Sequence, residues 1–175
     1  NHHTIVFNET DQTMKYNSFR AFLESKAEEK QRCEVVFTGD FSKTKLKAGE
    51  RLSIRDTYRD NCGGFITLSQ HVLLHNINLH YMHGLGVVSQ FSENITIRKV
   101  SVVPRLESGR IVSAFADCFH FSGCKGKILV DSCFTSGAHD DPINVHGTHL
   151  QIVAKTGSNK LTVRFMHHQT YGFEA

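Results

Sequence analysis

The sequence contains no tryptophan, only two prolines and no run of 18 apolar residues. The last absence excludes a membrane-spanning helix of ordinary length. With 39% hydrophobic and 21% charged residues, the composition excludes a disordered linker and indicates a globular chain. The 175 residues are enough for one domain with its own core. No signal-peptide pattern is present, and the abrupt beginning and end predict a piece of a longer protein.

An excess of charge of one sign is also missing. The formal net charge is +3 and the basic residues are scattered, so we predict no nucleic-acid partner. There is no C-x-x-C pair, which excludes a zinc ribbon or a thioredoxin-type motif. The odd number of cysteines leaves at least one thiol unpaired within the chain. We expect buried free thiols at Cys33, Cys62, Cys118, Cys124 and Cys133.

The first part of the chain, residues 1–57, mixes helix and strand patterns. Apolar residues at i, i+3, i+4 and i+8 predict a short helix over about residues 17–31. That stripe consists of Phe19, Phe22, Leu23 and Ala27. Short apolar or alternating runs predict strands at 3–7, 34–38, 44–48 and 51–55. We interpret residues 1–57 as an N-terminal segment separate from the repeats that follow.

Short apolar runs recur in residues 58–152. Their first apolar residues, at spacings of 23, 33 and 22, are Val72, Ile95, Ile128 and Leu150. A second series, at spacings of 33 and 24, is centred on Val87, His120 and Asn144. The polar loop 104–110 accounts for the one longer spacing. A period of about 23 residues without helices predicts an all-β fold, a right-handed parallel β-helix of the pectin-lyase-like solenoid type. Leucine-rich repeats have a similar period, but their consensus is absent.

Two further features complete the predicted fold. Ile77, Val100 and Cys133 occupy equivalent places in successive repeats, so we expect them to form an interior ladder. Alternating runs on both sides of residues 156–159 predict a β-hairpin. Residues 153–175 would therefore start a second, smaller β subdomain.

Carboxylates gather at one place in the repeats. Asp117 and Asp140 are 23 residues apart, which is one coil, and Asp141 follows directly. Adjacent coils stack at about 4.8 Å, so we expect all three side chains in one small volume. Like charges this close should raise the pKa of at least one carboxyl. A protonated acid beside an ionised base is what cleavage of a glycosidic bond requires, so we take these three as catalytic.

Histidines and an asparagine surround the aspartates. We predict that hydroxyl groups of a substrate are bound by His83, His120, His139, Asn144 and His146. By alternation, His120 should face away from Phe119 and Phe121. Because tryptophan is absent, a surface on which a sugar stacks would be Tyr81, Phe119 or another phenylalanine. Calcium at Asp140, Asp141 and Asn144 remains an alternative, whereas a zinc signature is missing. Our prediction is no metal and no cofactor.

Three stretches together resemble glycoside hydrolase family 110, the bacterial exo-acting α-1,3-galactosidases. They are YMHGLGVVSQFSENIT (81–96), ADCFHFS (116–122) and HDDPINVHGTH (139–149). The resemblance implies a β-helix with β-barrel insertions, of which residues 1–57 would be part. It also implies inverting hydrolysis without a metal and, as substrates, galactose-terminated glycans such as blood-group-B antigens. The implied location is secreted, periplasmic or at the cell surface of a bacterium.

The same resemblance places the acidic catalytic set on Asp117, Asp140 and Asp141. We assign Asp117 as the acid, with Asp140 and Asp141 holding the water, although polygalacturonases divide similar aspartates differently. Pro142 stands where the family leads us to expect alanine. The alternatives are another β-helix polysaccharide enzyme, either a polygalacturonase-like hydrolase or a lyase, and a non-catalytic solenoid such as an adhesin. An acidic substrate would call for several cations, and only Lys125 and Lys127 are near.

Overall fold

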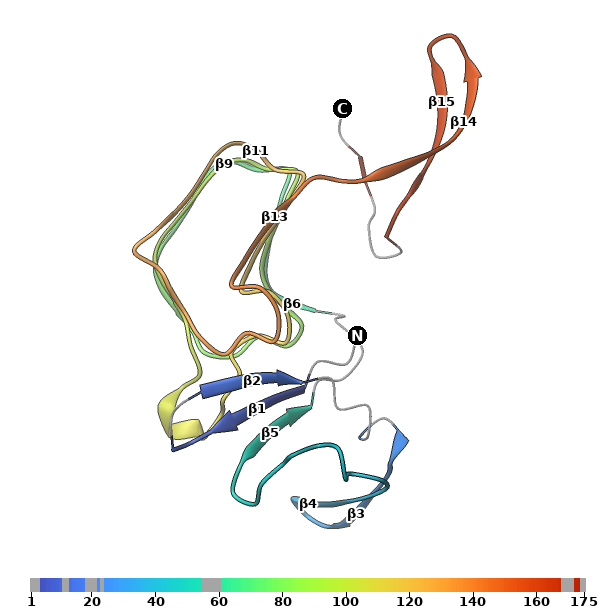
Figure 1. Cartoon of the computed structure of the whole chain (residues 1–175). Coiled ribbons are helices and arrows are strands. Elements are labelled where there is room, and N and C mark those ends of the chain that lie inside the picture. Colours follow the sequence, from blue (N-terminus) through green and yellow to red (C-terminus); the bar gives the residue numbers. More distant parts are fainter. Residues whose placement is uncertain are drawn as a thin grey trace.

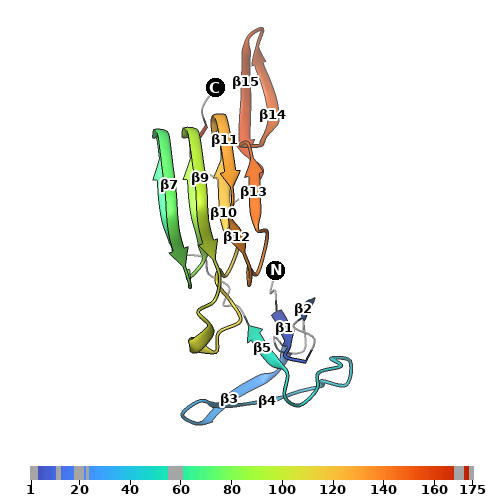
Figure 2. The ribbon, with the colours of Figure 1, turned by 90° about the vertical axis from the view of Figure 1, so that its left-hand side faces the viewer.

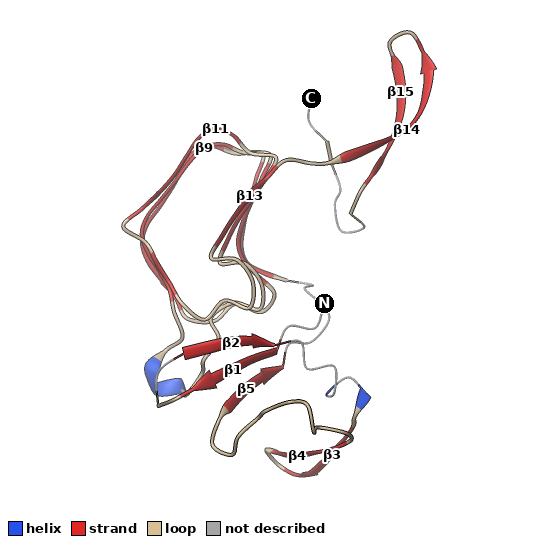
Figure 3. Ribbon diagram, viewed as in Figure 1, coloured by secondary structure: helices blue, strands red, loops and turns tan. Residues whose placement is uncertain are grey.

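A computed structural model describes residues 4–10, 13–17, 22, 24–54, 61–167 and 172–173. The described part of the chain is nearly all-β: its named elements are strands, apart from the 3-10 helix η1 (Leu106–Ser108) (Figure 1). Phe22 and Glu24 are helical too, and Figure 3 shows this second helical piece beside β3. None of the helical elements among the described residues is long and apolar enough to cross a membrane.

Two parallel sheets form the central part of the molecule. One sheet has the order β13-β10-β8-β6, and in the other β9 lies between β7 and β11, with β12 also paired to β9 (Figure 2). The first sheet contains β6 (Cys62–Thr67), β8 (Leu85–Gln90), β10 (Phe119–Ser122) and β13 (Ile143–His146). The second contains β7 (Gln70–Leu79), β9 (Glu93–Val102), β11 (Lys125–Asp131) and β12 (Phe134–Thr135). Strands of the two sheets alternate along the chain, so successive coils lie on one another.

The pairing confirms the predicted period and corrects its details. Ile95 pairs with both Val72 and Ile128, as the repeat predicts, and η1 lies in the loop that lengthens one coil. His120, however, pairs with Val88 rather than with Val87. Leu150 is not part of a further coil, because it begins an antiparallel strand. The hydrophobic period thus predicted the stacked coils correctly, but it wrongly added a further coil at Leu150.

The corners of the coils share one backbone conformation. The residue directly after β6, β8 and β10 of the first sheet has a positive φ. In the second sheet a residue inside β7, a residue inside β9 and the residue directly after β11 have a positive φ as well. The values are 49°, 48° and 62° at Leu68, Phe91 and Gly123, and 56°, 52° and 54° at Asn76, Lys99 and Ser132. These residues are level with one another on neighbouring coils. Since only a small left-handed region is open to residues other than glycine, the repeated corner fixes where each coil turns.

The core lies between the two sheets. It includes Ile95 and Ile97 from β9 and Phe119 and Phe121 from β10, each 0–1% exposed. The predicted ladder is present: Ile77 pairs with Val100, and Cys133 packs against the same cluster. Alternation leaves His120 on the outer face between two buried rings, as expected.

Antiparallel elements flank the coils at both ends of the chain. β1 (Thr4–Asn8) lies between β2 (Thr13–Asn17) and β5 (Arg51–Ile54), and β3 (Lys26–Gln31) pairs with β4 (Glu34–Thr38). Near the other end, β14 (Leu150–Gly157) and β15 (Lys160–Phe165) form the predicted hairpin.

Two predictions for the first segment are wrong. Instead of the second half of a helix, Lys26–Gln31 forms a strand, because the Val-Val-Phe run of β4 offers it a partner. Phe19 and Leu23 of the predicted stripe lie outside the described residues. The predicted strand at 44–48 is also absent: Thr44 donates through its amide to Phe41 O at 3.0 Å, and Lys45 has a φ of 50°.

All five cysteines are free thiols, but not all are buried. Cys118 is buried, and desolvation raises its pKa to about 11, which makes it unreactive. Cys33 and Cys62 are exposed, contrary to the prediction.

Candidate active site

A groove of about 860 Å³ lies along the outer face of the sheet β13-β10-β8-β6. Its floor comes from those strands, and Met166 and His167 beyond β15 contribute to a wall. Among the residues predicted from sequence, those that line it are Asp117, His120, Asp140, Asn144 and His146. Separate motifs of the chain therefore meet in one cavity.

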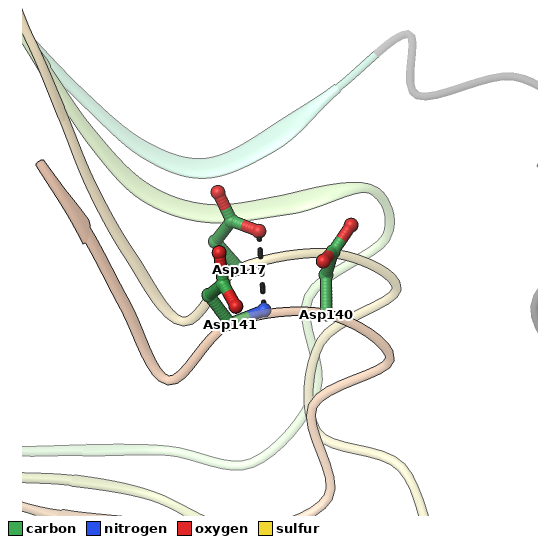
Figure 4. Close-up of side chains that lie close together, drawn as sticks. All are labelled: Asp117, Asp140 and Asp141. Atoms are coloured by element: carbon green, nitrogen blue, oxygen red, sulfur yellow. Dashed lines mark hydrogen bonds between the residues drawn. The ribbon is translucent and has the colours of Figure 1, made fainter. Parts of the chain in front are cut away.

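The three aspartates lie close together (Figure 4), and two of them, Asp117 and Asp140, line the groove. Each offers an oxygen that lies within 4.8 Å of the others. Phe119 pairs with Ile143, so counting two residues back along each strand brings Asp117 level with Asp141 rather than with Asp140. The Asp141 amide donates to Asp117 Oδ1 at 3.4 Å. Asp117 is 3% exposed, Asp140 is half-buried and Asp141 is exposed.

Backbone hydrogen bonds on both sides fix the position of Asp117. The Gly86 amide donates to Asp117 O at 2.8 Å, and the Cys118 amide donates to Asp141 O at 3.0 Å. A Cβ atom at Gly86 would lie 2.1 Å from Cys118 O. The coil that carries Asp117 can therefore approach β8 this closely only because residue 86 is glycine.

A chain of hydrogen bonds extends from Asp117 into the groove. His120 Nδ1 lies 2.6 Å from Asp117 Oδ2, His120 Nε2 lies 2.9 Å from His146 Nε2, and His146 Nδ1 lies 2.8 Å from Gly147 O. A carbonyl only accepts, so His146 carries a proton on Nδ1. With Asp117 ionised, His120 donates from Nδ1, and one further proton lies between the two Nε2 atoms. This hydrogen-bond pattern therefore gives the pair of histidines one positive charge.

This chain controls the ionisation of Asp117. Burial by itself would raise the pKa of the carboxyl, but the hydrogen bond and the charge of His120 lower it, helped by the Asp141 amide and the Asn144 side chain. The net result is a pKa below its ordinary value. A lowered pKa favours the ionised form of Asp117, which suits a base better than the acid that the sequence led us to assign there.

Two of the residues predicted to bind substrate lie outside the groove lining. His139 is 1% exposed, stacks on Phe115 with ring centroids 5.3 Å apart, and meets Ser53 Oγ at 3.0 Å. A ring this buried packs inside the structure next to Asp140 and does not reach the groove. His83 is exposed, and its ring meets the edge of Phe115 at 5.8 Å.

The aromatic residue in the groove is not one of those named from sequence. Phe119 is fully buried, and Tyr81 lines a different cavity, with the Arg110 guanidinium 4.0 Å from its ring. Phe65 lines the groove and is 51% exposed. It lies before the recognised motifs, and only its register with Val88 would have identified it.

The donors around Asp117 suit a catalytic carboxylate better than a metal ligand. Three carboxylates at this spacing could in principle receive a cation such as calcium. However, the oxygens of Asp117 already face donors, Oδ2 the His120 ring and Oδ1 the Asp141 amide. The His120 N–H that faces Oδ2 at 2.6 Å also stands where a cation bound to this oxygen would have to approach.

Comparison with known proteins identifies relatives of most of this chain. It is 54% identical over 129 residues to an α-1,3-galactosidase A of Bacteroides fragilis, covering 74% of this chain and 21% of that protein. It is 51% identical over 130 residues to an α-1,3-galactosidase A of Akkermansia muciniphila, covering 74% and 22%. To an α-1,3-galactosidase B of Phocaeicola vulgatus it is 33% identical over 171 residues, covering 97% and 28%. No family model matches the chain.

These relatives confirm the resemblance that the three motifs predict. The chain spans about a fifth of the length of the first two relatives and somewhat more of the third.

Proposed function

We propose that this chain carries the catalytic groove of an exo-acting α-galactosidase that releases terminal α-1,3-linked galactose. One observation supports this most directly: three carboxylates meet, two of them in the groove lining, in a chain that is 54% identical over 129 residues to an α-1,3-galactosidase A. The substrates would be galactose-terminated glycans. Since the relatives are bacterial and such glycans lie outside cells, we also propose a secreted, periplasmic or cell-surface location.

The stacked coils would form a right-handed parallel β-helix. Their strands pair in parallel at intervals of 23 to 33 residues. Crossover connections between parallel strands are right-handed in about 98% of cases, which supports this hand. In such a solenoid the outward residues of successive coils form rows, and these rows can line a groove along one face.

The roles of the aspartates follow from their surroundings. Asp117 is held ionised by His120, and Asp141 is level with it on the next coil, so the two can hold one water between them. Asp140, which precedes Asp141 in the chain, also lines the groove and would protonate the leaving oxygen. General acid–base assistance of this kind contributes about 10²- to 10⁴-fold.

The distance between the carboxylates bears on whether the reaction inverts or retains the anomeric configuration. The nearest oxygens lie within 4.8 Å, a spacing closer to the ~5–5.5 Å of a retaining pair than to the ~6.5–9.5 Å of an inverting pair. We propose inversion because two carboxylates hold the water while a third acts as the acid. A retaining pair needs no third carboxylate.

The lining of the groove argues against an acidic polysaccharide. Among the described residues that line it, charge comes from aspartates and histidines, without lysine or arginine. A uronic acid substrate would lie beside these carboxylates with no lysine or arginine among the described lining residues to offset the repulsion. A neutral galactoside fits this lining better than the substrate of a polygalacturonase or a lyase.

The test of this function is hydrolysis by the full-length protein. We expect galactose release from α-1,3-galactobiose and no cleavage of polygalacturonate. Cleavage of polygalacturonate with no galactose release would replace the proposal by the polygalacturonase-like alternative.

Replacing His120 by asparagine is expected to change the pH dependence of the reaction. Without His120, burial of Asp117 is less opposed and its pKa rises. Because Asp117 must be ionised to act as a base, the acidic limb of the pH profile of kcat/KM should move to higher pH. We also expect a loss of about 10-fold at the optimum, from one charge-assisted hydrogen bond of about 1.5 kcal/mol.

His75→Asn is the matched control, because His75 is an exposed histidine on β7, away from the groove. An unchanged acidic limb in His120→Asn would show that His120 does not set the ionisation of Asp117.

A further inference from the structure

One row of side chains crosses the floor of the groove from apolar to polar. Phe65 pairs with Val88, Val88 with His120, and His120 with Asn144, on the neighbouring strands β6, β8, β10 and β13. All four line the groove. Within this row, the β10–β13 half is polar and lies near the aspartates, while the β8–β6 half, Val88 and Phe65, is apolar.

Phe65 differs from the other phenylalanines of this sheet. Phe119 and Phe121 are 0–1% exposed and belong to the core, whereas Phe65 is 51% exposed on the groove face. Leu85, half-buried at the start of the adjacent strand β8, also lines the groove and pairs with Cys62 of β6. An exposed aromatic ring next to a catalytic cluster is a surface for a flat ligand with an apolar face.

We propose that Phe65, with Val88 level with it on β8, binds the sugar ring to which the terminal galactose is attached. This inference rests on the proposed function, since it names the subsite for the leaving group. One face of a pyranose ring exposes mainly C–H groups, which lose contact with water when they stack on an aromatic ring.

The spacing of the strands supports this division of the groove. Two strand spacings, or about 10 Å, separate β6 from β10. A terminal galactose at Asp117 and Asp140 would lie over β10 and β13, and the next sugar would lie over β8 and β6. Gln90 and Asn61, which also line the groove, could accept and donate hydrogen bonds to its hydroxyl groups.

The test compares two substrates that differ only in the leaving group. α-1,3-Galactobiose has a sugar that can reach Phe65, whereas α-galactosyl fluoride has none. In the full-length protein, Phe65→Ala is expected to lower kcat/KM about 10-fold for the disaccharide, at the upper end of a single aromatic contact. Turnover of the fluoride should change less than about twofold, and Phe65→Tyr should retain both activities.

Phe134→Ala is the matched control, because Phe134 is 64% exposed on β12 in the other sheet. If Phe65→Ala also loses fluoride turnover, Phe65→Leu provides the same comparison with an apolar side chain kept at this position. Equal effects on both substrates overturn the inference while the galactosidase function stands. A wild-type protein that releases galactose from neither substrate would instead overturn the proposed function, and the inference with it.

Discussion

Asp140→Asn is expected to lower kcat/KM for α-1,3-galactobiose about 10³-fold, within the range of general acid catalysis. Asparagine has nearly the shape of aspartate but no acidic proton. Asp117 cannot take over this role, because His120 holds it ionised and lowers its pKa. The loss of activity in Asp140→Asn should therefore be largest for substrates whose leaving group needs a proton in order to depart.

A substrate with an acidic phenol as leaving group separates this role from others. With 2,4-dinitrophenyl α-galactoside, Asp140→Asn should lose far less activity, whereas Asp117→Asn should lose activity on both substrates. Asp131→Asn is the matched control, since Asp131 pairs with Arg98 on the other sheet. If Asp140→Asn and Asp117→Asn respond alike to the two leaving groups, the division of roles is wrong.

Gly86→Ala is expected to destabilise the coils by about 3 kcal/mol, at the upper end of overpacking substitutions. The new Cβ would lie 2.1 Å from Cys118 O and 2.7 Å from Asp117 O. These are backbone atoms, so no side-chain rotation relieves the contact, and β8 must separate from the coil that bears Asp117. The midpoint of urea unfolding, followed by circular dichroism, should fall, and activity should fall with it.

Gly64→Ala provides the control within the same sheet. Its Cβ would meet Val87 at 3.8 Å, an ordinary contact, on the strand next to β8. We expect little change in its unfolding midpoint. A Gly86→Ala protein as stable as Gly64→Ala would mean that the coils are not packed as closely as described.

The stacking of coils was predictable because it imposes a period on the sequence. Val72, Ile95 and Ile128 align in the structure as their spacing indicated. The end of the short helix was not predictable: Phe22 and Glu24 are helical, but Lys26–Gln31 is a strand. An apolar stripe is a weaker determinant there than pairing with the β-branched run of β4. The prediction of a further coil at Leu150 was wrong for a related reason. An apolar run fits a coil or a hairpin equally well until the strand that pairs with it is known.

The chemistry of the site was predictable in its members but not in its roles. Asp117, Asp140 and Asp141 were identified from the sequence, where the spacing of 23 aligned Asp117 with Asp140. The observed register is shifted by one residue, so Asp141 is level with Asp117. The bond between His120 and Asp117 joins residues three apart at the start of a strand, and no motif indicates that ring orientation. Phe65 was missed because its place in the groove depends on pairing across β8 and not on neighbouring residues.

The most direct measurement is the configuration of the galactose released by the full-length protein from α-1,3-galactobiose, followed by proton NMR from the first minutes of the reaction. The arrangement of a water held by Asp117 and Asp141, with Asp140 as the acid, predicts that β-galactose appears first and the α anomer accumulates only by mutarotation. Initial release of α-galactose would contradict this mechanism, because it requires one of these carboxylates to attack the sugar itself.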